Sequence, residues 1–336
     1  MIIEGDCFEL IKTLPDESVD LVITSPPYAD IVNYGKNISI QKPTEYVDWI
    51  LPLFNEIQRV LKPSGSFILN INDNCSNGLR NPYIFELIHR SQKETKLKFY
   101  DTYIWHKLNG IPNGSPKRFR NTTEFIFHFV KNQKQLKFYM DRVMKEQKEI
   151  TKKRLKSPMV LKSHQQIIEG IRGSETTINT QPDKVRPDNV FRFSTASASR
   201  DNLIHHPAPF HKELPCYFIN LLTDKGDTIL DVFAGIGTTG LCCEDRNFIG
   251  YELNPIYADF ANERLDGILD KVYQINQYDM EDNFIASFDG ITTAANSINY
   301  STPHNIMMCY RGFRTEAGGY KWKLERKIDN QIKLDL

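Results

Sequence analysis

The sequence predicts an α/β protein with a mostly parallel sheet, because strand-like apolar runs alternate with helical patterns along much of the chain. Residues 19–24 form a β-branched apolar run without alternation, which is typical of a strand buried on both faces. Residues 45–61 then carry apolar side chains at intervals of three and four, as in a helix that lies on a sheet. The same alternation returns at 228–252, after a long polar stretch.

The first part of the chain divides into short elements. The apolar start at 1–4 predicts a strand, and the residues after it predict a turn and a short helix. In the helix at 45–61, Pro52 predicts a kink, and the sequence KPSG predicts the stop. The next predicted strand is SFILNI, residues 66–71.

The middle of the chain interrupts this pattern. Strands are predicted at 99–106 and 123–130, joined by a long basic loop. Residues 131–200 are rich in Lys and then in Ser, Thr, Asn and Pro, without an apolar period, and predict an inserted module with little core. A helix at 214–222 and then a strand, a glycine loop, a helix and a strand complete the fold, and the pattern weakens beyond 269.

Composition excludes several classes of protein. The mean hydropathy is negative and no apolar run reaches about 18 residues, so no membrane span is expected. The start MIIEGDCFEL lacks the features of a signal peptide, which predicts a cytoplasmic protein. The six cysteines show no CxxC spacing and predict reduced thiols, with neither a disulfide framework nor a zinc site. A metal site at His205, His206 and His211 is not favoured, and no metal is expected.

The charge is unevenly distributed. The whole chain is neutral, but residues 93–173 contain 19 Lys and Arg against 7 Asp and Glu. Such a segment suits a polyanion bound to one face, although a solvated surface is the alternative. Aromatic and glycine residues lie among the charges in WHKLNGIPNGSPKRFRN, and this mixture favours nucleic acid as the partner.

The strand at 19–24 ends in the sequence TSPPY, residues 24–28. Two adjacent prolines cannot continue a central strand, because neither has an N–H group and each has a fixed φ. The chain must leave the sheet in a stiff extended turn that holds its carbonyls and flanking side chains in fixed directions. A simple strand stop is the alternative interpretation.

A glycine-rich loop, DVFAGIGTTG at residues 231–240, follows a predicted strand, and Glu252 ends the next strand. This pattern also fits a dinucleotide-binding enzyme, in which the acid binds a ribose hydroxyl. Two observations favour another cofactor: a long stretch of chain precedes the loop, and TSPPY would have no role in hydride transfer. The two motifs make sense together if S-adenosylmethionine is bound and a methyl group passes to an amine.

With TSPPY before DVFAGIGTTG and a basic segment between them, the chain resembles the β-class amino-methylating DNA methyltransferases over about residues 1–265, outside the insert. The sequence IIEGD resembles the strand whose acid faces the adenine of the cofactor. HPAPFHKELP, residues 206–215, resembles the segment that closes over the methionine end. The resemblance implies S-adenosylmethionine as cofactor and a seven-stranded sheet, six strands parallel and one antiparallel, with helices on both faces.

The resemblance also implies a division of the chain and its partners. The expected parts are a catalytic half at 1–130, an inserted basic target-recognition region at 131–200, a cofactor-binding half at 201–270 and a C-terminal extension of unknown role at 271–336. Double-stranded DNA is the expected partner, which would associate the protein with the nucleoid. A cognate restriction endonuclease would act separately.

The sequence indicates the family more clearly than it indicates which base is methylated. Ser25 stands where cytosine-N4 enzymes of this family typically have Ser, so cytosine-N4 is expected, with adenine-N6 as the near alternative. Methylation at cytosine C5 would need a Pro-Cys nucleophile. Pro215-Cys216 lies inside an apolar helical stretch, and the Glu-Asn-Val partner of that family is absent, so we reject this possibility.

The resemblance assigns roles to individual residues. The Ser25 hydroxyl and the Pro26 carbonyl would each accept a hydrogen of the target amine, and Tyr28 would stack on the flipped base. The expected catalytic residues are Ser25, Pro26, Pro27 and Tyr28. The expected cofactor residues are Asp6 at the adenine, Glu252 at the ribose, and Cys7, Phe210, Leu214, Asp231, Phe233, Ala234, Gly235, Gly237, Thr238, Thr239 and Asn254. The expected phosphate contacts are Lys117, Arg118 and Arg120.

Overall fold

The structure is a computed structural model that describes residues 1–29, 42–73, 75–76, 78–110, 117–146, 159–161, 176–178, 184–194, 211–266, 273–288, 291–300, 305–306, 309 and 314–326. The helices of the main body are α1 (Cys7–Leu10), α2 (Tyr46–Val60), α3 (Tyr83–Glu94), α6 (Glu213–Leu222) and α7 (Pro255–Leu265). Its main strands are β1 (Ile2–Glu4), β2 (Val19–Thr24), β3 (Leu61–Ile71), β6 (Lys98–Lys107), β7 (Thr123–Val130), β12 (Val190–Phe193), β13 (Thr228–Asp231) and β14 (Asn247–Glu252).

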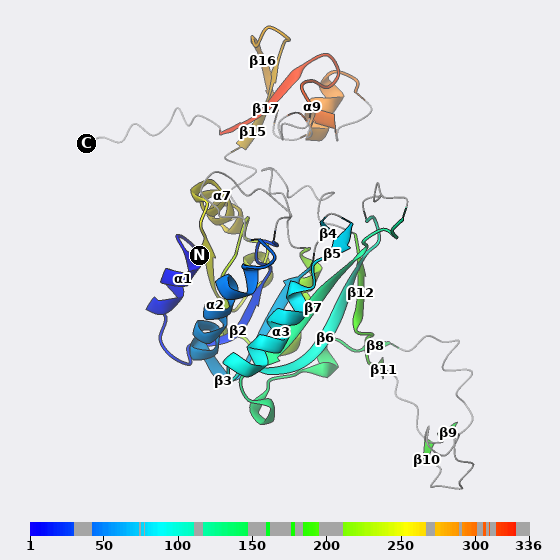
Figure 1. Cartoon of the computed structure of the whole chain (residues 1–336). Helices are drawn as coiled ribbons and strands as arrows, with labels where there is room; N and C mark the ends of the chain where they lie inside the picture. The colour runs from blue at the N-terminus through cyan, green and yellow to red at the C-terminus, as the bar shows by residue number, and fades with distance from the viewer. Residues whose placement is uncertain are drawn as a thin grey trace.

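These eight strands form one sheet in the order β1-β14-β13-β2-β3-β7-β6-β12. Figure 1 labels β2, β3, β7, β6 and β12 of this sheet. Only β7 runs antiparallel to its neighbours β3 and β6, and the other pairs are parallel. The α/β prediction is therefore confirmed. Without β12 the sheet has the expected seven strands, six of them parallel and one antiparallel.

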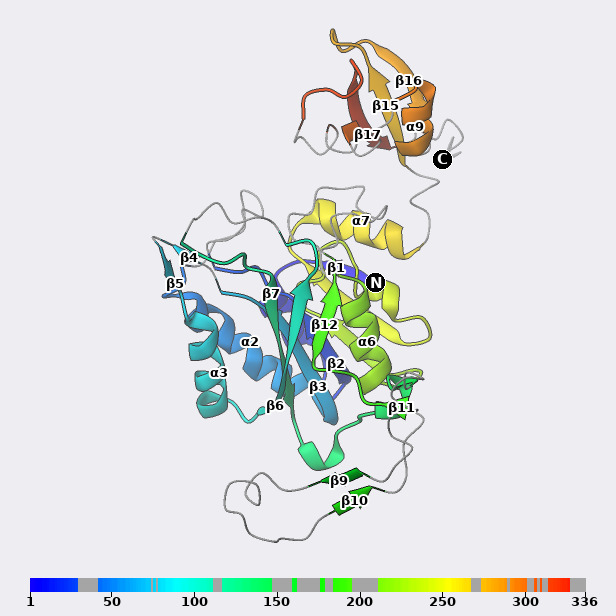
Figure 2. The ribbon, with the colours of Figure 1, turned by 90° about the vertical axis from the view of Figure 1, so that its right-hand side faces the viewer.

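Both faces of the sheet are covered by helices, which explains why β2 is apolar at successive positions (Figure 2). Val22 points to the face covered by α1, α2 and α3, where Phe54 of α2 packs. Leu21 and Ile23 point to the opposite face, where Phe218 of α6 packs. Each face thus has its own hydrophobic core, and β2 lies at the centre of both.

The parallel register aligns the carboxyl ends of the four neighbouring strands β1, β14, β13 and β2. Val22 of β2 lies opposite Leu230 of β13, and Asp231 lies opposite Gly250 of β14. Glu4 of β1 lies opposite Glu252 of β14. TSPPY, the glycine loop, Glu252 and Asp6 therefore all emerge at one edge of the sheet, where ligands of open α/β sheets bind.

Several elements differ from the sequence-based expectations. Strand β12 lies within the predicted insert at 131–200 yet pairs with β6 at the sheet edge. The helix that we expected after the glycine loop is a 3₁₀ helix of three residues, η5 (Gly240–Cys242). Helix α3, which we did not predict from the sequence, packs Ile84 and Leu87 beside α2.

Smaller elements complete the described chain: the 3₁₀ helices η1 (Ile11–Thr13), η2 (Gln133–Gln135) and η3 (Met140–Arg142), and the short strands β4 (Cys75–Ser76), β5 (Leu79–Arg80), β8 (Lys145–Glu146), β9 (Met159–Leu161), β10 (Thr176–Ile178) and β11 (Lys184–Val185). None of the helices in the described part of the chain is both long and apolar enough to cross a membrane.

The C-terminal extension has a sheet and a core of its own. Strands β15 (Tyr273–Tyr278), β16 (Phe284–Phe288) and β17 (Lys321–Arg326) form a three-stranded antiparallel sheet in the order β16-β15-β17. Helix α9 (Ile291–Ser297) contributes Ala294 and Ala295 to a core with Ile275 and Trp322. The C-terminal extension, for which we predicted no helices or strands from the sequence, thus includes a small folded unit.

Candidate active site at the carboxyl edge of the sheet

The two motifs are joined by a buried hydrogen bond. The Thr24 hydroxyl donates to Oδ1 of Asp231 over 2.6 Å, and the Phe233 N–H donates to the Thr24 hydroxyl oxygen over 3.2 Å. The Thr239 hydroxyl donates to Oδ2 of Asp231 over 2.5 Å. Burial raises the pKa of Asp231 to about 6, although the two hydroxyl donors oppose the shift. Asp231 therefore connects the start of TSPPY to both ends of the glycine loop.

The glycine loop has a backbone that other residues adopt poorly. Gly235 and Gly237 have φ values of 52° and 76°, in the left-handed region that favours glycine. A Cβ on Gly240 would lie 2.7 Å from side-chain atoms of Phe248 and Leu265, so this glycine permits close packing behind the loop. Ala234 and Thr238 are buried within the same turn.

Glu252 holds the loop from the neighbouring strand. Its Oε2 accepts the Gly235 N–H over 2.9 Å, and its Oε1 accepts the Asn254 N–H over 2.8 Å. Burial raises the pKa of Glu252, while these backbone donors lower it. Asn254 also caps α7 by accepting the Ile256 N–H, which gives this residue a structural role.

Asp6 lies beside Glu252, because the Gly5 N–H donates to the Glu252 carbonyl. The Asp6 side chain caps α1 by accepting the Phe8 N–H over 2.9 Å. Cys7 is buried, and burial raises the pKa of its thiol. The first turn of α1 thus closes one end of the site.

Aromatic rings that the sequence reading did not assign lie between these segments. Trp49 of α2 has its ring centroid 5.6 Å from that of Phe8 and 6.1 Å from that of Phe233. All three rings are only partly buried. Their separation in the chain hides the cluster, although Phe233 was expected at the cofactor. Because Phe233 belongs to the glycine loop and Phe8 follows Asp6 by two residues, the rings provide apolar surface between these two segments.

TSPPY is held by contacts on both sides. The Tyr46 hydroxyl of α2 donates to the Pro27 carbonyl over 3.0 Å. The Tyr28 hydroxyl donates to Oε2 of Glu124 over 2.9 Å and lies 3.3 Å from the Ser25 hydroxyl. Among the described residues, none donates a hydrogen bond to the Pro26 carbonyl. The turn is thus anchored at the Pro27 carbonyl and the Tyr28 hydroxyl, with Ser25 partly exposed and Pro26 buried.

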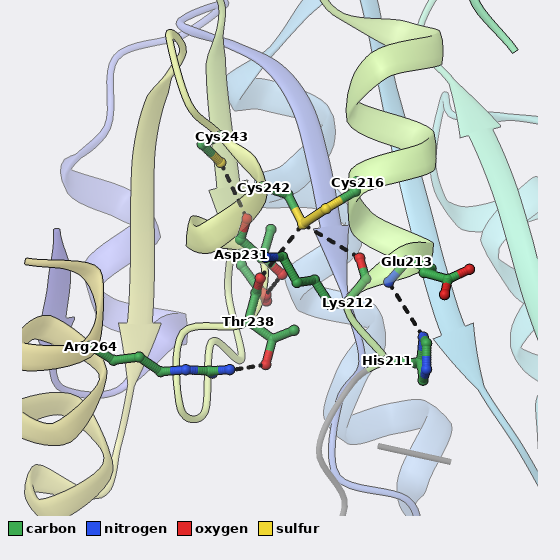
Figure 3. The surroundings of a disulfide bond; sticks show 10 residues. His211, Lys212, Glu213, Cys216, Asp231, Thr238, Cys242, Cys243 and Arg264 are labelled. Carbon is green, nitrogen blue, oxygen red and sulfur yellow. Dashed lines mark hydrogen bonds between the residues drawn. A yellow bond between two sulfur atoms is a disulfide. The ribbon is translucent and has the colours of Figure 1, made fainter. Parts of the chain in front are cut away.

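Two further contacts brace the loop from behind (Figure 3). Arg264 of α7, which the sequence reading did not assign, donates to the Ile236 carbonyl over 2.9 Å and to the Thr238 hydroxyl over 3.3 Å. Cys216 of α6 forms a disulfide with Cys242 of η5. The prediction of six reduced thiols is therefore wrong for these two, because the fold brings their Cα atoms within 4.8 Å.

The remaining expected site residues lie in different surroundings. Leu214 is fully buried in the core that α6 forms with the sheet. Lys117, Arg118 and Arg120 lie on the segment that enters β7, and Arg118 donates to the Gly78 carbonyl. Phe210, His205 and His206 lie outside the described residues. The basic segment thus borders the same edge of the sheet as the catalytic motif.

The edge has the features that a nucleoside-containing cofactor requires. The left-handed glycines, the partly buried residue Glu252, Asp6 and the Phe8–Trp49–Phe233 rings come from four neighbouring segments. Carboxylates suit ribose hydroxyls and an adenine amine, and the rings suit an apolar base. The residues present therefore fit the expected S-adenosylmethionine.

Comparison with known proteins agrees with this geometry. A family model described as DNA methylase matches residues 19–263, and a NUMOD1 domain model matches residues 273–304. The chain is 28% identical over 279 residues to the type II methyltransferase M.PvuII of Proteus hauseri, covering 76% of this chain and 80% of that protein. It is 30% identical over 277 residues to the DNA adenine methyltransferase YhdJ of Escherichia coli, covering 79% and 82%.

Among solved structures, the chain resembles the cytosine-N4-specific PvuII DNA methyltransferase with a TM-score of 0.58 and 24% identity, over 79% of this chain and 92% of that one. This likeness concerns the fold. The first family match spans both motifs and the strands that carry them, and it favours methyl transfer over hydride transfer.

Proposed function

The chain belongs to the DNA methylase family, and from this premise we propose that it transfers a methyl group from S-adenosylmethionine to the exocyclic N4 amine of a cytosine flipped out of duplex DNA. The observation that carries the proposal is the Thr24–Asp231 hydrogen bond, which joins the turn that would hold the amine to the loop that would hold the cofactor. When bound, S-adenosylmethionine supplies an electrophilic methyl group with a good leaving group.

The chain's own residues would hold and orient the amine. An exocyclic amine is a poor nucleophile, because its lone pair is delocalised into the ring. The Ser25 hydroxyl and the Pro26 carbonyl each accept one amino hydrogen, which directs the lone pair outward. Pro26 and Pro27 fix the direction of that carbonyl. Alignment of this kind supplies a large part of the rate of a two-reactant step.

Tyr28 would stack on the flipped base. Flipping costs a few kcal/mol, and stacking on an aromatic side chain contributes about 1–3 kcal/mol per base. The Tyr28 ring is partly exposed and its hydroxyl is anchored at Glu124, which supports a fixed ring face. Lys117, Arg118 and Arg120 would contact phosphates and fix the position of the duplex without reading its sequence.

The region at 131–200 would read the target site, and the halves at 1–130 and 201–270 would supply catalysis and cofactor binding. The name of the M.PvuII relative, a type II methyltransferase, supports a restriction–modification role, with a cognate endonuclease acting separately. Adenine-N6 methylation is the second candidate, because the 30% identical relative is an adenine methyltransferase. Ser25 in the first motif position favours cytosine.

One experiment tests the base directly. The purified protein is incubated with plasmid DNA and methyl-labelled S-adenosylmethionine, the DNA is digested, and the labelled nucleoside is identified. N4-methylcytosine supports the proposal, and N6-methyladenine alone replaces it by the second candidate. Duplex binding without label in any DNA pool would instead indicate a DNA-binding module without transferase activity. A Ser25→Ala variant, tested on mismatched cytosine too, should lose transfer in both substrates.

A further inference from the structure

A carboxylate that the sequence reading did not assign lies directly behind the catalytic turn. Glu124, the second residue of β7, is 7% exposed. Its Oε2 accepts the Tyr28 hydroxyl over 2.9 Å and the Asn70 amide over 3.0 Å. Its Oε1 pairs with the Lys107 ammonium of β6. Three donors from three segments therefore converge on one buried side chain.

The ion pair determines what this side chain can do. A buried carboxylate without an opposite charge is costly, and Lys107 supplies that charge from the adjacent strand. An ionised carboxylate has no hydrogen to donate and can only accept. The single hydroxyl hydrogen of Tyr28 is therefore directed to Glu124.

This direction has a consequence for Ser25. Because the Tyr28 hydrogen is used, the Tyr28 oxygen can only accept in its 3.3 Å contact with the Ser25 hydroxyl. The Ser25 hydrogen then points to Tyr28, and the lone pairs of the Ser25 oxygen face elsewhere. A serine that must accept a hydrogen from an amine needs this orientation.

We propose that Glu124 is a positioning residue for methyl transfer: it directs the hydrogen-bond chain from Ser25 through Tyr28 so that the Ser25 oxygen is an acceptor for the target amine. The inference rests on the proposed function, since it concerns the same amine. It adds a role for Glu124, held by Lys107 and Asn70, that the TSPPY motif alone does not contain.

Glu124→Gln tests the direction of the hydrogen-bond chain, because glutamine has almost the same shape as glutamate. The glutamine must turn its NH₂ group either toward Lys107, donor against donor, or toward Tyr28 and Asn70, which also donate. Either arrangement disturbs the hydrogen-bond chain from Ser25 through Tyr28. Tyr28→Phe keeps the ring for stacking and removes the same link. We expect each variant to lower kcat about tenfold or more, while the dissociation constants for S-adenosylmethionine and duplex DNA change less than about twofold.

A double-mutant cycle separates positioning from a merely structural role. If Glu124 acts through Tyr28, the double variant loses no more kcat than the more impaired of the two single variants, because either substitution alone already breaks the hydrogen-bond chain. Glu124→Asp keeps the charge and should recover part of the kcat. Additive losses, or full kcat in Tyr28→Phe, would overturn the inference. Full kcat in Tyr28→Phe overturns the inference even where Glu124→Gln does not fold.

A control and the wild type complete the design. Glu56→Gln removes a partly exposed carboxylate that pairs with Arg59 on α2, and it should leave kcat unchanged. A wild-type protein that methylates no base contradicts the proposed function itself. An active wild type with fully active Glu124→Gln and Tyr28→Phe variants contradicts only the positioning role.

Discussion

The Thr24 hydroxyl donates a 2.6 Å hydrogen bond to Asp231, and this bond links residues 207 positions apart at the ends of two adjacent parallel strands. Both side chains are almost fully buried, at 1% and 3% exposure. A buried carboxylate needs its donors, so the bond couples the position of the catalytic turn to that of the glycine loop.

Thr24→Val tests this coupling, because valine keeps the shape of threonine without the hydroxyl. Oδ1 of Asp231 would retain only the Phe233 N–H. We expect the free energy of unfolding in urea to fall by about 1–2 kcal/mol and the single-turnover methyl-transfer rate to fall as well. Thr24→Ser, which keeps the donor, should behave like the wild type. Wild-type stability and rate in Thr24→Val would contradict the coupling.

Asp231 also predicts a pH dependence of stability. Its pKa is about 6 in the folded protein, above the ordinary value of 3.8, because burial disfavours the charged form. The folded state therefore binds the proton more tightly than the unfolded state. The contribution is fully present below about pH 4 and is lost as the pH rises through about 6, on the order of 3 kcal/mol.

Asp231→Asn isolates this effect. Unfolding free energies of the wild type and the variant are measured from pH 4 to pH 7, and their difference cancels the titration of other groups. The wild type should lose stability relative to the variant as the pH rises across this range. A difference that is independent of pH would show that Asp231 is ionised throughout.

Glu252→Gln should weaken the binding of S-adenosylmethionine about tenfold, measured by calorimetry. Glutamine has one acceptor oxygen, so either the Gly235 N–H or the Asn254 N–H loses its partner, and the acceptor for a ribose hydroxyl is also lost. Glu86→Gln on the exposed side of α3 is the matched control and should bind normally. Tight binding of NAD with no response to S-adenosylmethionine would favour a dehydrogenase.

Local sequence patterns were sufficient to predict a secondary-structure element where a segment determines its own structure. Strands 19–24 and 123–130 were predicted at their observed bounds, because both are long apolar runs rich in β-branched and aromatic residues. The four residues of β12 lack such a run, and their place depends on pairing with β6. The contact of Phe8 with Trp49 similarly depends on how α2 docks.

The candidate site likewise combines features that the local sequence predicts with features that depend on the folded structure. TSPPY and the glycine loop were visible as motifs, but their connection through Thr24 and Asp231 required the sheet register. Glu124 could have been noticed as an acid inside the apolar run TEFIFHFV, a position that demands a partner. The partner of Cys216 could not be inferred from spacing, because α6 and η5 meet only in the folded chain.

The disulfide predicts a count of thiols. With Cys216 and Cys242 paired, thiol titration in denaturant should find four free cysteines before reduction and all six after it. The link closes a loop with a sequence separation of 26, so reduction should lower the free energy of unfolding by about 3 kcal/mol. Cys216→Ser should reproduce the effect of reduction, and six titratable thiols before reduction would contradict the pairing.

The basic segment before β7 predicts a salt dependence of DNA binding. Each phosphate contact releases counterions, so the logarithm of the affinity falls with the logarithm of the salt concentration by nearly one unit per contact. Lys117→Ala and Arg120→Ala together should therefore reduce the slope by about two. Arg118 is left in place, because it also donates to the Gly78 carbonyl and its loss would disturb the loop.

The slopes are measured by fluorescence anisotropy on a labelled duplex between about 50 and 200 mM salt. Lys225→Ala is the matched control, because its side chain is 86% exposed and precedes β13 at the opposite edge of the sheet from the catalytic turn. That variant should keep the wild-type slope. Equal slopes in the double variant and the wild type would mean that the duplex approaches by another surface, since charge removed from a true phosphate contact must change the counterion count.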